Sequence, residues 1–142
     1  MIEHVETDEA IAACYDVMAE LRVHVSRAEF LPTVRAMQAE GLRLACIRDA
    51  GRVVAVAGYR ISTNLFCGKH LYVDDLVTAE TERSRGHGKA LLSWLRALAV
   101  ENDCDVFHLD SGVQRKRAHQ FYLREGLELS SYHFSERLKP RT

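Results

Sequence analysis

The sequence contains no apolar run approaching the ~20 residues that a helix needs to cross a membrane. Its first ten residues, MIEHVETDEA, are acidic and lack the apolar segment of a secretory signal. The four cysteines include no C-x-x-C pair, and no two of the seven histidines lie at metal-ligand spacing beside an acidic residue. The net charge is only −1, so bulk electrostatics favours neither nucleic acid nor an anionic membrane. These absences predict a cytoplasmic protein with no metal site, no nucleic-acid partner and no membrane partner.

The 142 residues are enough for one domain with a buried core, expected over residues 1–142. Apolar spacing predicts a helix that begins at Thr7 or Asp8 and reaches Leu21, and three later helices over 29–40, 86–101 and 117–125. Strands are predicted over 2–6, 42–48, 53–62, 70–78, 105–110 and 127–138. The order β-α-α-β-β-β-α-β-α-β predicts an α/β (α+β) fold. Its central sheet would be mixed and mostly antiparallel, with about 6–7 strands and helices on both faces.

The stretch RSRGHGKALLSWLRALA, from Arg83 to Ala99, places two glycines at the start of an amphipathic helix. It does not match the dinucleotide fingerprint G-x-G-x-x-G, because position 91 is leucine. It does not match a P-loop either, because Arg83 stands where the first glycine belongs. Neither standard phosphate motif therefore explains the turn.

Elementary electrostatics still points to an anion at this turn. The first N–H groups of a helix lack intrahelical partners and carry partial positive charge. Arg83, Arg85 and Lys89 add three cations at that end, each costing ~0.3–1 kcal/mol unless an anion binds. Gly86 and Gly88 would let a pyrophosphate approach the backbone. A plain glycine turn with solvated basic residues explains the stretch equally well.

Two motifs resemble the GNAT superfamily of acetyl-CoA-dependent N-acetyltransferases. Arg83-x-x-Gly86-x-Gly88 resembles its R/Q-x-x-G-x-G/A signature. AHQFYLREGLE (Ala118–Glu128) resembles its second hallmark, which is A-x-x-x-Y followed by a basic-acidic-glycine turn and a strand. The element order across the whole chain is also similar. Within the superfamily, AHQFYLREG and HFSERL most resemble bacterial aminoalkylphosphonate N-acetyltransferases and similar small-molecule enzymes.

The resemblance implies a coenzyme A site in this half of the chain. Its cofactor-binding residues would be Leu76, Val77, Thr78, Arg83, Ser84, Arg85, Gly86, His87, Gly88 and Lys89. The backbone of the first three would pair with the pantetheine amides, and the N–H groups from Ser84 through Lys89 would hold the pyrophosphate. Tyr122 would lie near the thioester sulfur. Arg115 is a departure, because the family often has asparagine there.

Acetyl transfer requires a base for the attacking amine, and the sequence offers three aspartates. Asp74 and Asp75 lie in the middle of an otherwise apolar strand, and Asp110 ends the next strand. Alternation predicts that only one of Asp74 and Asp75 faces the cleft, unless a bulge cancels it. Asp75 is favoured because similar small-molecule acetyltransferases carry an acid at that spacing. Tyr122 would be the proton donor for the leaving thiolate.

The acceptor expected from the resemblance is a primary amine of a small molecule, attacked directly in a ternary complex. Arg22, His24 and Arg27 would meet an anionic group on it, although a solvated helix face explains them equally well. A protein N-terminus or lysine is the alternative acceptor. A non-catalytic acyl-CoA-binding sensor is the alternative function. A homodimer stays open, because the sequence does not give the oligomeric state.

Overall fold

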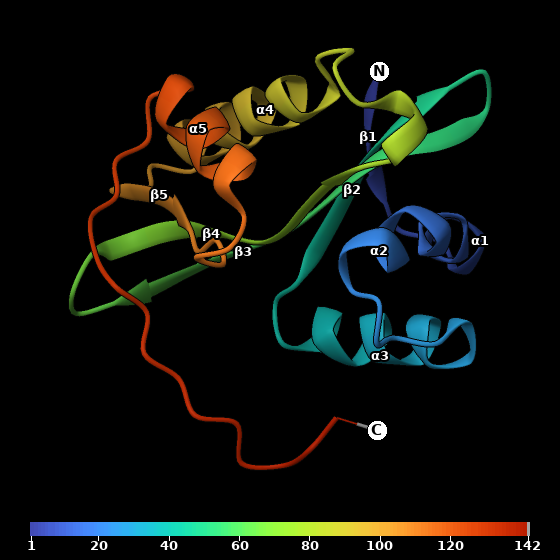
Figure 1. Cartoon of the computed structure of the whole chain (residues 1–142), viewed down its shortest axis with the longest axis horizontal. Helices are drawn as coiled ribbons and strands as arrows, with labels where there is room; N and C mark the ends of the chain where they lie inside the picture. The colour runs from blue at the N-terminus through green and yellow to red at the C-terminus, as the bar shows by residue number, and fades with distance from the viewer. Residues whose placement is uncertain (142) are drawn as a thin grey trace.

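One five-stranded sheet organises the chain in the computed structural model, which describes residues 1–141 (Figure 1). Its strands, which lie in chain order, are β1 (Ile2–Val5), β2 (Arg43–Asp49), β3 (Arg52–Asn64), β4 (Gly68–Thr78) and β5 (Val106–Leu109). The helices are α1 (Asp8–Ala13), α2 (Tyr15–Leu21), α3 (Arg27–Ala39), α4 (His87–Glu101) and α5 (Lys116–Arg124), with a 3₁₀ turn η1 (Glu80–Glu82). Strands β1 to β4 pair antiparallel, whereas β4 and β5 pair parallel across the α4 connection. The predicted mixed, mostly antiparallel sheet is confirmed.

Helices cover both faces of the sheet, and each face has its own apolar core (Figure 1). One core packs Ile11 of α1 and Val34 of α3 against Leu44 of β2. The other packs Leu91 and Leu95 of α4 against β4. Both leucines are fully buried, and burying such a side chain stabilises the fold by about 1.5–3 kcal/mol. No helix within residues 1–141 is long and apolar enough to span a bilayer.

Three helices rather than two precede β2, which corrects the expected element order. The expected first helix is divided at Cys14, which ends α1 and begins α2. The Cys14 N–H donates to the Ile11 carbonyl three residues back, at 3.0 Å, so the α-helical ladder breaks there. The apolar spacing continues through this break because Cys14 itself is buried in the core. Spacing alone therefore predicts one helix where the backbone forms two.

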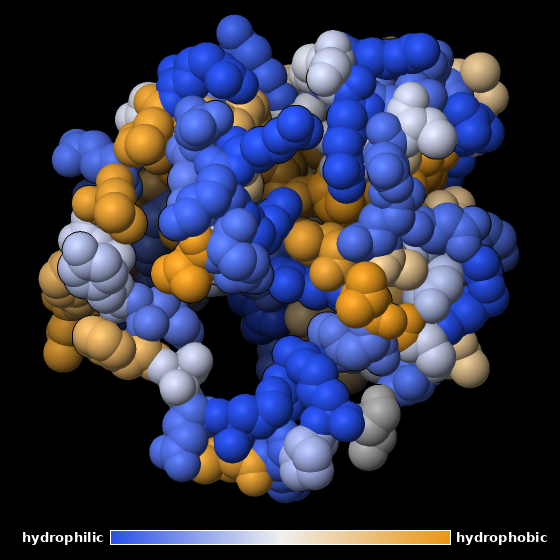
Figure 2. Space-filling view, in the orientation of Figure 1, coloured by the Kyte–Doolittle hydropathy of each residue, from blue (hydrophilic) through white to orange (hydrophobic). Residues whose placement is uncertain are grey.

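The sheet has five strands rather than the expected 6–7, because residues 127–141 form neither helix nor strand. Leu129, Tyr132 and Phe134, whose alternation predicts a strand, are largely exposed. Part of the segment loops away from the rest of the molecule, and a gap lies beside it (Figures 1 and 2). An alternating pattern forms a strand only where a sheet edge supplies hydrogen bonds, and none of these residues pairs with β5.

Candidate active site

Strand β4 is longer than its partner β5, and the difference leaves part of its edge unpaired. The parallel pairing joins β5 to His70–Val73 only. From Asp74 to Thr78, no strand within residues 1–141 pairs with this edge of β4. Free backbone N–H and C=O groups on such an edge can pair with an extended chain of amides. The predicted cofactor-binding residues Leu76, Val77 and Thr78 all lie on this stretch.

The glycine turn follows directly after that edge. Gly86 is the N-cap of α4 and has a left-handed backbone, with φ +83°, and no side chain caps the helix. Ser84 also has a positive φ, at +69°. A Cβ built on Gly88 would lie 3.8 Å from Thr78 Oγ1 and 3.7 Å from Phe121 Cζ. The first turn of α4 therefore lies between the end of β4 and helix α5, with its N–H groups uncapped.

The charge around this turn includes an acid that a count of its cations leaves out. Glu82 is only 7% exposed and pairs with Arg85 at 3.4 Å and with Arg52 at 3.7 Å. His87 Nε2 lies 3.9 Å from Glu82 Oε1, and both atoms are buried without a hydrogen-bond partner among the described residues. Glu82 therefore offsets Arg85, whereas no ion pair within residues 1–141 involves Arg83 or Lys89. The surplus of positive charge expected at this helix end is smaller than a count of its cations suggests.

A β-bulge places both predicted strand acids on one face of the sheet. The pairing of β3 with β4 passes from Gly58–Asp75 to Tyr59–Val73, so Asp74 is the extra residue. A Cβ on Gly58 would lie 2.8 Å from Asp75 Oδ2, and Arg60 Nε donates to Asp74 Oδ2 at 3.0 Å. Because Gly58 and Arg60 are two residues apart, they share a face of β3. The bulge therefore cancels the alternation that would otherwise place Asp74 and Asp75 on opposite faces.

Asp75 is the more enclosed of the two acids. Its side chain is 14% exposed, and Arg22, which ends α2, donates from Nε to Asp75 Oδ1 at 2.7 Å. Arg22 also donates from NH2 to the Asp74 carbonyl at 2.8 Å. Burial raises the pKa of the Asp75 carboxyl above its ordinary value, and Arg22 acts in the opposite direction. Asp75 is therefore a stronger base than an exposed aspartate.

The other basic side chains predicted to meet an anionic substrate are placed differently from Arg22. Arg27 pairs with Asp16 and stacks over the Tyr15 ring, 4.7 Å from its centroid. His24 is exposed, and the small desolvation it undergoes, with nearby arginines, lowers its pKa. Of the three, only Arg22 is joined to the acids of β4.

Asp110 lies just beyond the end of β5 and accepts a hydrogen bond from the Tyr72 hydroxyl at 2.8 Å. Tyr72 is the cross-strand partner of Arg60, so Asp110 and Asp74 are linked to neighbouring side chains of β3 and β4. Burial and this hydrogen bond raise the pKa of Tyr72. Asp110 is half exposed, and His133 Nδ1 lies 3.6 Å from its carboxylate.

Tyr122 lies on α5, which packs against α4. Arg96 of α4 donates a hydrogen bond to the Glu125 carbonyl at the end of α5, and Phe121 of α5 lies close to Gly88 of α4. Burial raises the pKa of the Tyr122 phenol, and the neighbouring Arg115 guanidinium opposes this shift. No hydrogen bond within residues 1–141 joins Tyr122 to Asp74, Asp75 or Asp110. An open hollow of about 340 Å³ lies beside the start of α5 and is lined by Gln114 to Ala118.

The sequence of the chain is similar to those of known proteins in one family. The model of the acetyltransferase (GNAT) family matches residues 9–127. The chain belongs to the GNAT family. It is 32% identical over 135 residues to the uncharacterized N-acetyltransferase YhdJ of Bacillus subtilis, covering 94% of this chain and 95% of that protein. Over 66 residues it is 32% identical to an aminoalkylphosphonate N-acetyltransferase of Salmonella typhimurium, covering 46% of this chain and 43% of that protein.

Solved structures agree with this membership at the level of the fold. An aminoglycoside N-acetyltransferase in complex with CoA superposes with a TM-score of 0.82 at 13% identity, covering 99% of this chain and 96% of that one. As a GNAT protein, the chain is an acetyl-CoA-dependent acyltransferase. The unpaired edge of β4 and the uncapped first turn of α4 fit such a donor, because one offers peptide groups and the other offers N–H groups.

Proposed function

We propose that this GNAT protein, acting as a single catalytic domain over residues 1–142, acetylates a primary amine of a small molecule by direct attack in a ternary complex. The observation that carries the proposal is the divergence of β4 from β5 after Val73. It leaves the Asp74–Thr78 edge free for the donor and puts the buried carboxylate of Asp75 on the same strand. The donor and a proton acceptor for the amine would thus meet at one edge.

Acetyl-CoA would supply the acetyl thioester, and the chain would hold it by its backbone. Leu76, Val77 and Thr78 would pair with its amides, and the N–H groups from Ser84 through Lys89 would hold its pyrophosphate. An N–H group near Val77 or Thr78 would meet the negative charge that develops on the acetyl oxygen. Lys89 and Arg83, which form no ion pair within residues 1–141, would add positive charge for the phosphates.

The side chains would move two protons. An amine with a pKa near ~10.4 costs roughly 4.6 kcal/mol to deprotonate at neutral pH, so a positioned carboxylate assists the attack. Asp75 would accept that proton, with Asp74 and Asp110 as the alternative acceptors on the same side. Tyr122 would donate a proton to the leaving thiolate. A small acceptor with an anionic group is supported by the relative that is named for aminoalkylphosphonates. Arg22, whose side chain is partly exposed beside Asp75, would meet that group.

The substrate class is tested by measuring release of free CoA thiol with a panel of amines. The panel contains aminoalkylphosphonates, aminoglycosides and polyamines, together with peptides that carry a free N-terminus or a lysine. We expect turnover with at least one small amine and none with the peptides. Turnover with peptides alone would overturn the proposed acceptor. CoA binding without thiol release from any amine would instead identify a sensor.

Replacing Tyr122 with phenylalanine should lower kcat at least several-fold at neutral pH. A phenol near pKa ~10 is a usable but mildly uphill acid for a thiolate near ~8.5, so its loss slows turnover without abolishing it. Burial raises the Tyr122 pKa further, so the phenol is protonated at neutral pH but is a weaker acid than a free tyrosine. Steady-state rates measured against Tyr132→Phe, a matched change on the exposed C-terminal segment, check this. Equal rates for both variants at neutral and alkaline pH would remove the acid role.

A further inference from the structure

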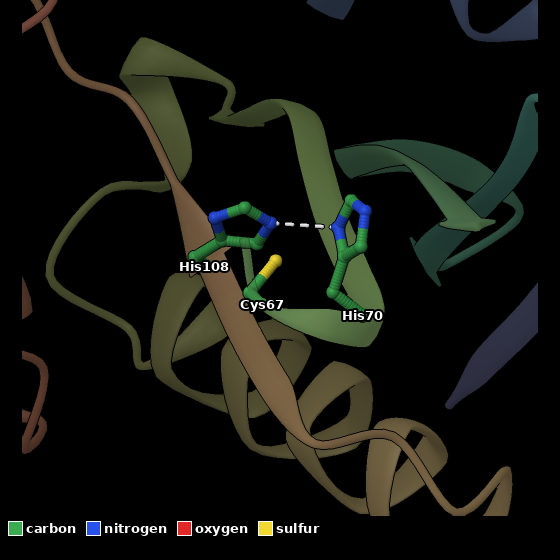
Figure 3. A group of neighbouring side chains, drawn as sticks. All are labelled: Cys67, His70 and His108. Atoms are coloured by element: carbon green, nitrogen blue, oxygen red, sulfur yellow. Dashed lines mark hydrogen bonds between the residues drawn. The ribbon is translucent and has the colours of Figure 1, made fainter. Parts of the chain in front are cut away.

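Three side chains that take no part in the proposed acetyl transfer meet where the β3–β4 turn approaches β5 (Figure 3). Cys67 lies in that turn, His70 near the start of β4 and His108 on β5. The sulfur and one nitrogen from each ring lie within 4.8 Å of one another. The histidines come from different strands, so spacing along the chain does not bring them together. The only local signal is the Cys67-x-x-His70 separation.

One nitrogen of each imidazole points toward a nitrogen of the other ring. His108 Nε2 lies 2.8 Å from His70 Nδ1, and the ring planes are nearly perpendicular, at 76° (Figure 3). A neutral pair satisfies this contact with one shared N–H, whereas two protonated rings would repel at this distance. A cation between the two nitrogens would bind both lone pairs. His70 is 7% exposed, so the contact is shielded from water.

Ser62 favours the ligand form of His70, whereas Asn64 favours the protonated thiol of Cys67. Ser62 Oγ lies 3.3 Å from His70 Nε2, and a hydrogen bond donated by that nitrogen leaves Nδ1 free as a ligand. The Cys67 thiol donates to Asn64 Oδ1 at 3.2 Å and would lose its proton to become the thiolate ligand.

The geometry points to a transition-metal site formed by Cys67 Sγ, His70 Nδ1 and His108 Nε2, with Zn²⁺ as its ion. A mixed sulfur and imidazole donor set suits Zn²⁺ and disfavours Mg²⁺ and Ca²⁺, which take oxygen ligands. Tetrahedral Zn²⁺ with bonds of about 2.0–2.1 Å to nitrogen separates two such ligands by about 3.3 Å. The nitrogens, now 2.8 Å apart, would open by about half an ångström, which side-chain rotation supplies. Three protein ligands leave the fourth position for water.

The ion would join the β3–β4 turn to β5. These two elements lie at one end of the β4–β5 pair. The unpaired Asp74–Thr78 edge lies at the other end. Binding to the folded chain alone would raise the melting temperature with metal concentration.

The site is tested on the full chain after removal of metal with a chelator. Titration with Co²⁺ should give one ion per chain, tetrahedral d–d bands and a thiolate-to-metal charge-transfer band. Competition with Zn²⁺ should abolish these bands, and Zn²⁺ alone should raise the melting temperature. Because Cys67 lies in a surface turn, Cys67→Ser should fold normally yet lose the charge-transfer band and at least about 100-fold in Zn²⁺ affinity.

The control variant is Cys104→Ser, which removes another half-buried cysteine outside the cluster and should keep the band. Ser62→Ala should weaken Zn²⁺ binding about 10-fold, because it removes only the partner of His70. Cobalt spectra without a thiolate band, a band that survives Cys67→Ser, or the absence of saturable binding at one ion per chain would each overturn the site.

Discussion

Replacing Gly88 with leucine should weaken acetyl-CoA binding by about two to four orders of magnitude while the fold persists. The new side chain would extend from between Thr78 and Phe121, where the end of β4 meets the first turn of α4. It would block approach to the N–H groups proposed to hold the pyrophosphate. A hydrogen bond to a charged group contributes about 1.5–3 kcal/mol, so losing two such bonds gives the expected range.

Gly88 tests the phosphate site more cleanly than Gly86. Gly86 has φ +83°, so any side chain there strains the backbone and lowers stability as well as affinity. A Cβ at Gly88 meets its neighbours at ordinary contact distances, 3.7 and 3.8 Å. Calorimetry on Gly88→Leu should be compared with Ser93→Leu, which places the same side chain on the exposed surface of α4. Similar CoA affinities for the two variants would show that the pyrophosphate binds elsewhere.

The elements that depend on local pattern were predictable from the sequence. The glycine turn and the amphipathic stripe that follows it predict helix α4 almost to the residue, because capping and periodicity are local signals. Residues 127–138 have an equally clear alternation, yet they form no strand in the structure. Whether such a segment pairs depends on a distant sheet edge, which no local pattern records.

The sequence offers candidate residues for the site, but it does not give their geometry. The positions of Asp74 and Asp75 in an apolar strand mark them as unusual, but alternation places them on opposite faces. The bulge that brings them together is a mismatch between β3 and β4, so it is visible only in their pairing. The partnership of Asp75 with Arg22, 53 residues away, is likewise a product of the tertiary fold.

Replacing Asp75 with asparagine should lower kcat by about 10²–10⁴-fold, the contribution typical of a positioned general base. The amide oxygen can still accept the Arg22 Nε–H bond, so the variant removes the charge while keeping the contact. The pH profile gives a second readout. Because burial raises the Asp75 pKa, wild-type turnover should fall with decreasing pH at a higher pH than an ordinary aspartate would produce. Asp75→Asn should lack that acid limb.

Asp74→Asn is the matched control, because it makes the same chemical change at the adjacent residue of the same bulge. The Asp74 carboxylate pairs with Arg60, and Arg22 contacts only its backbone carbonyl, so this variant should lose less than about tenfold in kcat. A large loss confined to Asp74→Asn would transfer the role of base to Asp74. Equal and negligible losses would exclude both as bases, and Asp110→Asn would then show whether the acid beyond β5 accepts the proton. Turnover measured over a range of pH in the four proteins therefore assigns the base to one carboxylate or excludes all three.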